Sequence, residues 1–383
     1  MPNNEGVYRL LQGGVASDDV EFRAVHAQAV EQKKNPKRPV PPPLMSVNLA
    51  VVDSGTFAEG EQFFLDRLVA SGDASGGFSS VRLTKGKPVT TGYHGSHVAS
   101  IAIAGTAMIK LVDVQICSHQ EIGQNNPAAW ATGFKWAIGQ GARVINCSVI
   151  CPWTDPAVEG VVQGNTGVLF VATAGNSDRE FTTELRATMG MANANMLLVS
   201  GCANDGSREA QRGFGSGIDV YAPSKQIPGL VARGLVQSLQ YYDARVNADK
   251  VLASIEEDRA RWTLRRDDLK KQLEEDPGNA LAKMQLTMME KKGFVPTRNV
   301  PAVPGSPDVI PVNPGDQARR DNGSSFALPM ASNVAAKMML ISPNITPSEI
   351  IAIMRDTAEG CAVGRVLDPK RCYEGALANR GGG

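Results

Sequence analysis

The sequence lacks long apolar runs and an excess of either charge. Its 39 Lys and Arg residues balance 39 Asp and Glu residues, so the composition gives no reason to expect a nucleic-acid partner. No segment approaches the ~18 uninterrupted apolar residues that a membrane-spanning helix needs. The N-terminal residues also lack the basic start and apolar core of a secretory signal. We therefore expect a cytoplasmic protein that does not act at a membrane.

Cysteine and histidine are both scarce. The six cysteines show no Cys-x-x-Cys spacing and mostly lie in or beside apolar runs, which favours reduced, structural thiols over a disulfide framework or a cysteine nucleophile. Of the four histidines, His26 and His119 lie in polar surroundings without a motif, whereas His94 and His97 stand where a glycine-containing loop leads into an apolar helix. This pair has no third ligand nearby, so no metal site is predicted. No acidic loop has the ligand spacing of a calcium site, and we assign no calcium ligand.

Short β-branched runs alternate with helical patterns from Val47 onward. The segments VNLAVV, IKLVDVQIC, RVINCS, GVLFVAT, MLLVSGC and IDVY resemble buried strands, and HVASIAIAG and PAAWATGFKWAIGQG resemble helices. This alternation predicts an α/β fold with a mostly parallel central sheet and helices on both faces. We assign residues 45–224 and 320–383 to this domain. Residues 1–44 are polar and end in a proline-rich stretch, which predicts an N-terminal arm.

A charged segment, residues 225–319, interrupts the domain. Its first helical pattern has a narrow apolar seam that consists of Ile255, Trp262, Leu269 and Leu273. The turn sequence DPGN at 276–279 ends that pattern. The seam of a second helical pattern consists of Leu281, Met284, Met288 and Lys291. We expect an inserted α-helical hairpin over residues 236–292 in which the two seams face each other.

The insertion ends only a few residues before Asn322, so we expect it to lie near the mouth of the site described next. Its return, residues 295–314, is rich in proline and is predicted to be extended. Two interpretations of the insertion stay open. It is either a solvent-exposed addition that has no role in the site, or an element that acts as a lid or as a docking site for a regulatory protein.

Three short segments carry the residue types of a serine hydrolase. A serine hydroxyl needs an imidazole to accept its proton and a carboxylate to orient that imidazole. Asp53 directly follows a buried strand, and strand ends in open parallel sheets line the ligand crevice. Ser325 stands after a glycine at the start of an apolar helix. Each residue alone has a structural explanation, as a loop aspartate or a helix cap, but their joint occurrence with His94 favours catalysis.

The three segments resemble the sequence blocks of the subtilisin-like serine peptidases, or subtilases. Residues 53–55 (DSG) correspond to the family's Asp-Ser/Thr-Gly block, and residues 94–99 (HGSHVA) to its His-Gly-Thr-His-Val-Ala block. Residues 323–329 (GSSFALP) correspond to its Gly-Thr-Ser-Met-Ala block with the trailing proline. The order Asp, His, Ser along the chain is also the order found in subtilisin. The resemblance covers about residues 47–221 and 322–378.

The resemblance implies a catalytic triad in which Ser325 is the nucleophile, His94 the base and Asp53 the residue that orients the base. His97, one turn after His94, is implied to be structural. The segment VATAGNS at 171–177 resembles the family segment whose asparagine faces the developing oxyanion. It implies that Asn176 is catalytic, together with the backbone amide of Ser325 as a second donor.

Substrate-binding residues are also implied by the resemblance, and they lie in two segments: Ser148, Val149, Ile150, Thr173, Ala174 and Gly175. The first segment aligns with the family strand that pairs with an extended substrate. Val149 and Ile150 replace the family's usual Leu-Gly, so we expect the bulky Ile150 to narrow the primary pocket.

The function implied by the resemblance is that of a serine endopeptidase that is regulated or substrate-selective. It hydrolyses an extended protein or peptide substrate through an acyl-enzyme and needs no cofactor for catalysis. One alternative is a catalytically silent module that binds a peptide in the same groove, but the intact Asp53, His94, Asn176 and Ser325 argue against it. A second alternative is a serine esterase. Esterases usually show a Gly-x-Ser-x-Gly turn, and residues 323–327 lack the second glycine.

Overall fold

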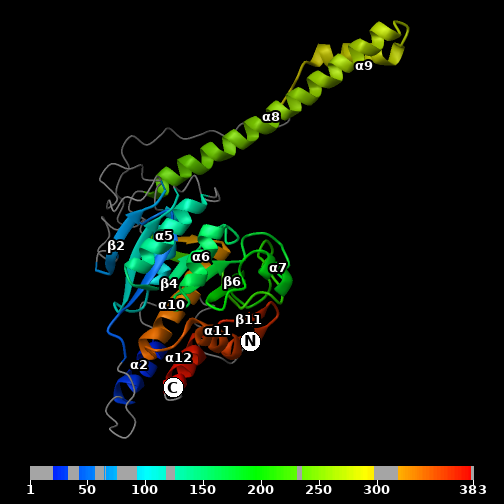
Figure 1. Ribbon diagram of the computed structural model, residues 1–383. Coiled ribbons are helices and arrows are strands. Elements are labelled where there is room, and N and C mark those ends of the chain that lie inside the picture. Colours follow the sequence, from blue (N-terminus) through cyan, green and yellow to red (C-terminus); the bar gives the residue numbers. More distant parts are fainter. Residues whose placement is uncertain are drawn as a thin grey trace. The chain divides into compact units, whose positions relative to one another are not determined.

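A nine-stranded sheet lies at the centre of the larger part of the chain (Figure 1). The computed structural model describes residues 20–32, 43–56, 64, 66–75, 93–117, 126–230, 235–296 and 318–380. The chain divides into two units. We call Met1–Arg233 with Asn313–Gly383 the sheet unit, and Gly234–Val312 the hairpin unit.

The strands follow the order β10, β11, β7, β6, β5, β4, β1, β3, β2 across the sheet. In that order their bounds are Glu359–Cys361, Gly364–Val366, Val220–Pro223, Met196–Cys202, Leu169–Thr173, Ala142–Cys147, Val47–Asp53, Ile109–Gln115 and Leu68–Asp73. Neighbouring strands run parallel, except that β10 and β11 are antiparallel. The predicted α/β fold with a mostly parallel sheet is therefore confirmed.

Both faces of the sheet are covered, which explains why apolar residues of its central strands point to both faces rather than to one. In β1, Leu49 and Val51 belong to one core, and Ala50 and Val52 belong to the other. Helices α2, α4, α10, α11 and α12 contribute to the first core, with bounds Val20–Gln32, Tyr93–Ala102, Ser324–Ile341, Pro347–Thr357 and Pro369–Asn379. Helices α5, α6 and α7 contribute to the second, with bounds Pro127–Gly139, Pro156–Gly164 and Thr183–Thr188.

Helix α10 is buried along its whole length. It contacts α4 and six strands of the sheet, and Asn333 ties it to the end of α4. The Asn333 side-chain amide donates to the carbonyl oxygens of Ala102 and Ala104, each at 2.9 Å. A helix held on all sides in this way fixes the position of its first turn, where Ser325 lies.

The prediction of an N-terminal arm over residues 1–44 is wrong in one respect. Residues 20–32 form helix α2, and its side chains Phe22, Val25 and Ala29 are buried in the first core. The ring of Phe22 lies edge-on to Tyr373 of α12, with 5.7 Å between the ring centroids. The spacing i, i+3, i+7 of these three residues is a helical stripe that the polar composition of the segment conceals.

A short antiparallel ladder brackets the insertion. Strand β8 (Ile227–Leu230) pairs with β9 (Ala318–Asp321) in a register from Ile227 opposite Asp321 to Leu230 opposite Ala318. Both strands belong to the sheet unit, although the predicted insertion at 225–319 contains all of β8 and the first two residues of β9. The hairpin unit therefore starts after β8 and ends before β9, and the two attachment points are direct neighbours.

The hairpin unit consists of two packed helices, as predicted. Helix α8 (Leu235–Glu275) and helix α9 (Ala280–Lys292) are joined by the turn at 276–279. In that turn the Asp276 carboxylate accepts from the Gly278 amide at 3.0 Å, and the Asn279 side chain caps α9. Ile255 and Leu269 of the predicted α8 seam are buried.

The predicted seam of α9 is wrong. Leu281, Met284 and Met288 are 61%, 54% and 53% exposed, whereas Ala282 is buried. The cap at Asn279 fixes where α9 starts, and hence which of its faces turns toward α8. The face that contains Ala282 packs, so the three larger residues form a stripe in solvent.

Most of the proline-rich return at 295–314 lies outside the described residues, which resume at Ala318. None of the helices that the structure describes is both long enough and apolar enough to span a bilayer.

Candidate active site

Asp53 is the last residue of β1 and is fully buried. Its Oδ1 atom accepts a hydrogen bond of 2.7 Å from the backbone amide of Ser54, and its carbonyl oxygen accepts one of 2.9 Å from Ile116. The first bond orients the carboxylate, and the second fixes the backbone that carries it. The end of the strand thus presents a fixed carboxylate.

His94 lies in the first turn of α4 and faces that carboxylate. Its Nδ1 atom is 2.8 Å from Asp53 Oδ1 and 2.9 Å from Asp53 Oδ2. The close approach of the start of α4 to the chain after β1 requires a glycine at position 95, because a Cβ there would lie 2.1 Å from the carbonyl oxygen of Gly55. Nδ1–H donates to the carboxylate, which leaves Nε2 on the other side of the ring as the atom that can accept a proton.

The pKa of His94 lies above its usual value. Burial alone would lower it, but the charge of Asp53, the hydrogen bond to Asp53 and the charge of Asp321 together outweigh burial. These acids stabilise the imidazolium, which is the form that a general base adopts after it has taken a proton.

His97 has a different environment from His94. It is completely buried, and its Nε2 atom donates to the carbonyl oxygen of Ile227 in β8 at 3.1 Å. Its Nδ1 atom is 3.3 Å from Asp321 Oδ2 in β9. Gly229 is needed here, because a Cβ at that position would lie 1.8 Å from the His97 ring. His97 therefore joins α4 to both strands that bracket the insertion.

Ser325 is in the first turn of α10 and is 6% exposed. Its carbonyl oxygen accepts a hydrogen bond of 2.8 Å from Ser148 Oγ, which in turn accepts one of 2.9 Å from the Asn146 side chain. Asn146 Oδ1 accepts a hydrogen bond of 2.9 Å from Ser332 Oγ, which lies about two turns after Ser325 on α10. This buried chain of hydrogen bonds fixes the start of α10 against the end of β4.

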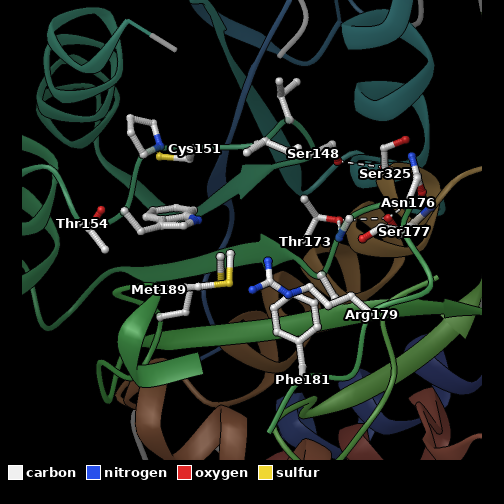
Figure 2. Close-up of a pocket in the computed structure, with 18 of the residues that line it drawn as sticks. Ser148, Cys151, Thr154, Thr173, Asn176, Ser177, Arg179, Phe181, Met189 and Ser325 are labelled. Carbon is white, nitrogen blue, oxygen red and sulfur yellow. Dashed lines mark hydrogen bonds between the residues drawn. The ribbon is translucent and has the colours of Figure 1, made fainter. Parts of the chain in front are cut away.

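Asn176 follows β5 and is held by the residue before Ser325. Its Oδ1 atom accepts from both the backbone amide and the hydroxyl of Ser324, each at 2.9 Å. The Ser324 hydroxyl also lies 3.0 Å from Thr173 Oγ1. Because Oδ1 faces Ser324, the Nδ2 donor of Asn176 points away from Ser324. Figure 2 shows the Asn176 side chain beside Ser325.

A cavity of about 630 Å³ opens at these residues (Figure 2). The predicted site residues that line it are His94, Ser148, Val149, Ile150, Thr173, Ala174, Gly175, Asn176 and Ser325. Asp53 lies behind His94. Ile150 is 59% exposed at this cavity, and Val149 is buried. The fold thus brings together every residue that the sequence analysis placed in the site.

Several residues that support the site were missed from the sequence. Asn146 and Ser332 were unmarked polar residues in a strand and a helix, and only the fold brings them together. Asp321 stands four residues before Ser325 but carries no motif. Arg179 lines the cavity wall and follows Asn176 by three residues.

Among the described residues, no group of three or more His, Cys, Asp or Glu side chains could hold a metal ion. None of the six cysteines, all of which lie among the described residues, forms a disulfide. Burial raises the pKa of Cys147 and of Cys151 well above the usual thiol value, so neither is poised as a thiolate.

Comparisons with known proteins agree on one family. The Subtilase family model matches residues 46–271, which is more than half of the chain. "Subtilisin Savinase" of Lederbergia lenta is 28% identical over 145 residues, and "M-protease" of Shouchella clausii (strain KSM-K16) is 29% identical over 145 residues. Each match covers 35% of this chain, and 51% and 36% of those two proteins. The chain therefore spans about half, or less, of the length of these curated relatives.

Solved structures show the same fold at low sequence identity. A cold-adapted subtilisin-like serine proteinase superposes with a TM-score of 0.50 at 17% identity, covering 84% of this chain and 86% of its own. The prenylagaramide maturation protease PagA gives a TM-score of 0.50 at 16% identity, covering 89% of this chain and 95% of its own. Fervidolysin from Fervidobacterium pennivorans gives 0.51 at 17% identity, covering 87% and 42%.

Proposed function

The chain belongs to the subtilase family, and we propose that it is a serine endopeptidase whose catalytic residues are Asp53, His94, Ser325 and Asn176. The observation that supports this most directly is the contact of His94 Nδ1 with both carboxylate oxygens of Asp53, at 2.8 and 2.9 Å, in a cavity that also contains Ser325 and Asn176. A buried carboxylate, an imidazole and a helix-start serine are the three groups that acyl transfer by serine requires.

In the proposed reaction, Ser325 Oγ attacks the carbonyl carbon of the scissile peptide bond while His94 Nε2 takes the hydroxyl proton. The carbonyl oxygen becomes an oxyanion, which Asn176 Nδ2 and the backbone amide of Ser325 stabilise as donors. The amide of Ser325 is available because the first amides of a helix have no partner within it. His94 then gives its proton to the leaving amine, and a water molecule attacks the acyl-enzyme by the same sequence of proton transfers.

The charged Asp53 matters in both halves of this reaction. It keeps the proton of neutral His94 on Nδ1, so that Nε2 faces the nucleophile, and it stabilises the imidazolium that forms. The substrate is expected to bind as an extended strand along residues 148–150, with selectivity from the side-chain cavity.

Incubation with an unfolded protein tests the proposal. The parent protein should produce new peptide termini that mass spectrometry can locate, and Ser325→Ala and His94→Ala should produce none. Binding of the unfolded protein to Ser325→Ala, without any cleavage by the parent, would instead support the silent peptide-binding module.

We further propose that the hairpin unit regulates this activity, either as a lid or as a docking site for a partner protein. Two contacts connect the strands that bracket the insertion to α4, the helix that carries His94. The carbonyl of Ile227 in β8 and the carboxylate of Asp321 in β9 both contact His97, which lies one turn after His94 on α4. The exposed stripe of Leu281, Met284 and Met288 on α9 offers an apolar surface to a partner.

The register of β8 and β9 makes the hairpin unit removable. Leu230 and Ala318 are paired neighbours, so a short Gly/Ser turn can replace residues 231–317 without stretching the ladder. Faster hydrolysis of both a small peptide and an unfolded protein would support a lid. Loss of cleavage of one protein substrate only would support docking. Unchanged rates on all substrates in a folded variant would contradict regulation.

A further inference from the structure

Among the described residues that line the cavity adjoining Ser325, Arg179 alone carries a permanent charge. The wall opposite the nucleophile is made largely of apolar or weakly polar groups, among them Cys151, Trp153, Phe181 and Met189. The remaining lining residues are neutral, apart from His94. Within the described lining, a charged substrate group therefore meets one fixed charge, the guanidinium group of Arg179.

The Arg179 side chain is held on the cavity wall. Its backbone amide donates to the carbonyl oxygen of Ser177 at 2.8 Å, and its own carbonyl oxygen accepts from Phe214 at 3.0 Å. The guanidinium carbon lies 5.9 Å from the centroid of the Phe181 ring. In Figure 2 the side chain extends over Phe181 and points its guanidinium group toward Met189.

The acidic neighbours of Arg179 in the sequence contact other residues. Asp178 forms an ion pair with Arg208, and the side chain of Glu180 packs against Gly215. Within the described part of the chain, no carboxylate forms an ion pair with Arg179. The five donors of its guanidinium group are thus available to a ligand in the cavity.

We propose that Arg179 selects substrates with an acidic side chain, glutamate or aspartate, on the residue that precedes the scissile bond. This rests on the proposed peptidase function. The carbonyl of that residue must lie between Ser325 and Asn176, so its side chain is the one that enters the adjoining cavity. A carboxylate there forms charge-assisted hydrogen bonds with the guanidinium group, while its methylene stem contacts the apolar wall.

Matched fluorogenic peptides that differ only at this residue test the proposal. The parent should cleave the Glu peptide about tenfold faster in kcat/KM than the isosteric Gln peptide, which corresponds to about 1.4 kcal/mol. Arg179→Met keeps the stem and removes the charge, so the ratio should fall to about one. Arg179→Glu should favour a Lys peptide over the Gln peptide. A preference for Gln or Leu in the parent, or a Glu preference that survives in Arg179→Met, would overturn the proposal.

Arg365→Met is the matched control, because Arg365 is exposed on β11 and does not line the cavity. It makes the same change in net charge and should keep the parent's Glu preference. The Glu preference should also weaken as salt concentration rises, since Arg179 is partly solvated.

A binding measurement separates this proposal from the proposed function. Fluorescence anisotropy with labelled Glu and Gln peptides is measured on Ser325→Ala and on Ser325→Ala with Arg179→Met. Tighter binding of the Glu peptide that is lost with Arg179 supports the role of Arg179, even if the parent cleaves no peptide and the peptidase function fails. Equal binding of the two peptides to Ser325→Ala would overturn the role of Arg179 while leaving the peptidase function to its own test.

Discussion

Replacement of Asp113 by asparagine should stabilise the protein at neutral pH. Asp113 lies in the middle of β3 and is 1% exposed. Its Oδ2 atom accepts a hydrogen bond of 2.8 Å from Ser71 Oγ, but no cation is among the groups that affect its pKa. Burial, helped by the nearby charge of Asp53, raises the pKa of Asp113 from 3.8 to about 6.

The sign of the effect follows from this shift. The folded protein holds the Asp113 proton more tightly than the unfolded chain does, so its contribution to stability is complete below pH 3.8 and is lost as pH rises through about 6. A shift of roughly two pH units corresponds to roughly 3 kcal/mol in the free energy of unfolding. Asparagine is neutral at every pH and keeps an oxygen that can accept from Ser71.

We therefore expect Asp113→Asn to match the parent at pH 4 and to exceed it by about 3 kcal/mol at pH 7.5. Urea unfolding measured by tryptophan fluorescence in a Ser325→Ala background avoids self-digestion. Trp130, Trp136 and Trp153 all report on the sheet unit. The control is Asp356→Asn, which makes the same substitution at an exposed position. A stability difference that is constant from pH 4 to 7.5 would refute the reasoning.

Three further predictions concern the site and the N-terminal helix. Asn176→Ala should lower kcat about 100- to 1,000-fold with little change in KM, because only the oxyanion loses a donor; an unchanged kcat would remove Asn176 from the site. Asp321→Asn should shift the acid limb of kcat/KM to lower pH, because the charge of Asp321 raises the pKa of His94; no shift would contradict this coupling. Phe22→Ala should destabilise the sheet unit by about 3 kcal/mol in urea unfolding, and a change near zero would show that α2 is not part of the core.

The sheet and its helices could be predicted because the signal is local. Each buried strand is a short β-branched run, and the start of α11 is marked by Thr346 and Glu349, whose reciprocal capping hydrogen bonds are present. Asp53, His94 and Ser325 were found because each stands at the end of a strand or the start of a helix within a recognisable block. Their roles stay predictions until activity is measured, as does the cytoplasmic location.

What the sequence did not reveal depends on pairings between distant residues. The polar composition around Phe22 concealed a core helix, because its partner Tyr373 lies at the other end of the chain. The rotation of α9 about its axis depends on where the Asn279 cap starts the helix, because a shift of one residue turns the buried face by about 100°. Arg179 gave no signal, since its significance lies in the absence of an acid across the cavity rather than in any motif.

Reaction with a fluorophosphonate probe, followed by peptide mapping, tests the central claim most directly. Such probes modify only a serine whose hydroxyl is activated by a neighbouring base. We predict one modified residue, Ser325, in the parent protein and no modification in Ser325→Ala or His94→Ala. Ser324→Ala, which removes the adjacent hydroxyl, should still be modified at Ser325. An unmodified parent protein, or a label on Ser324 or any other residue, would contradict the assignment of Ser325 as the nucleophile.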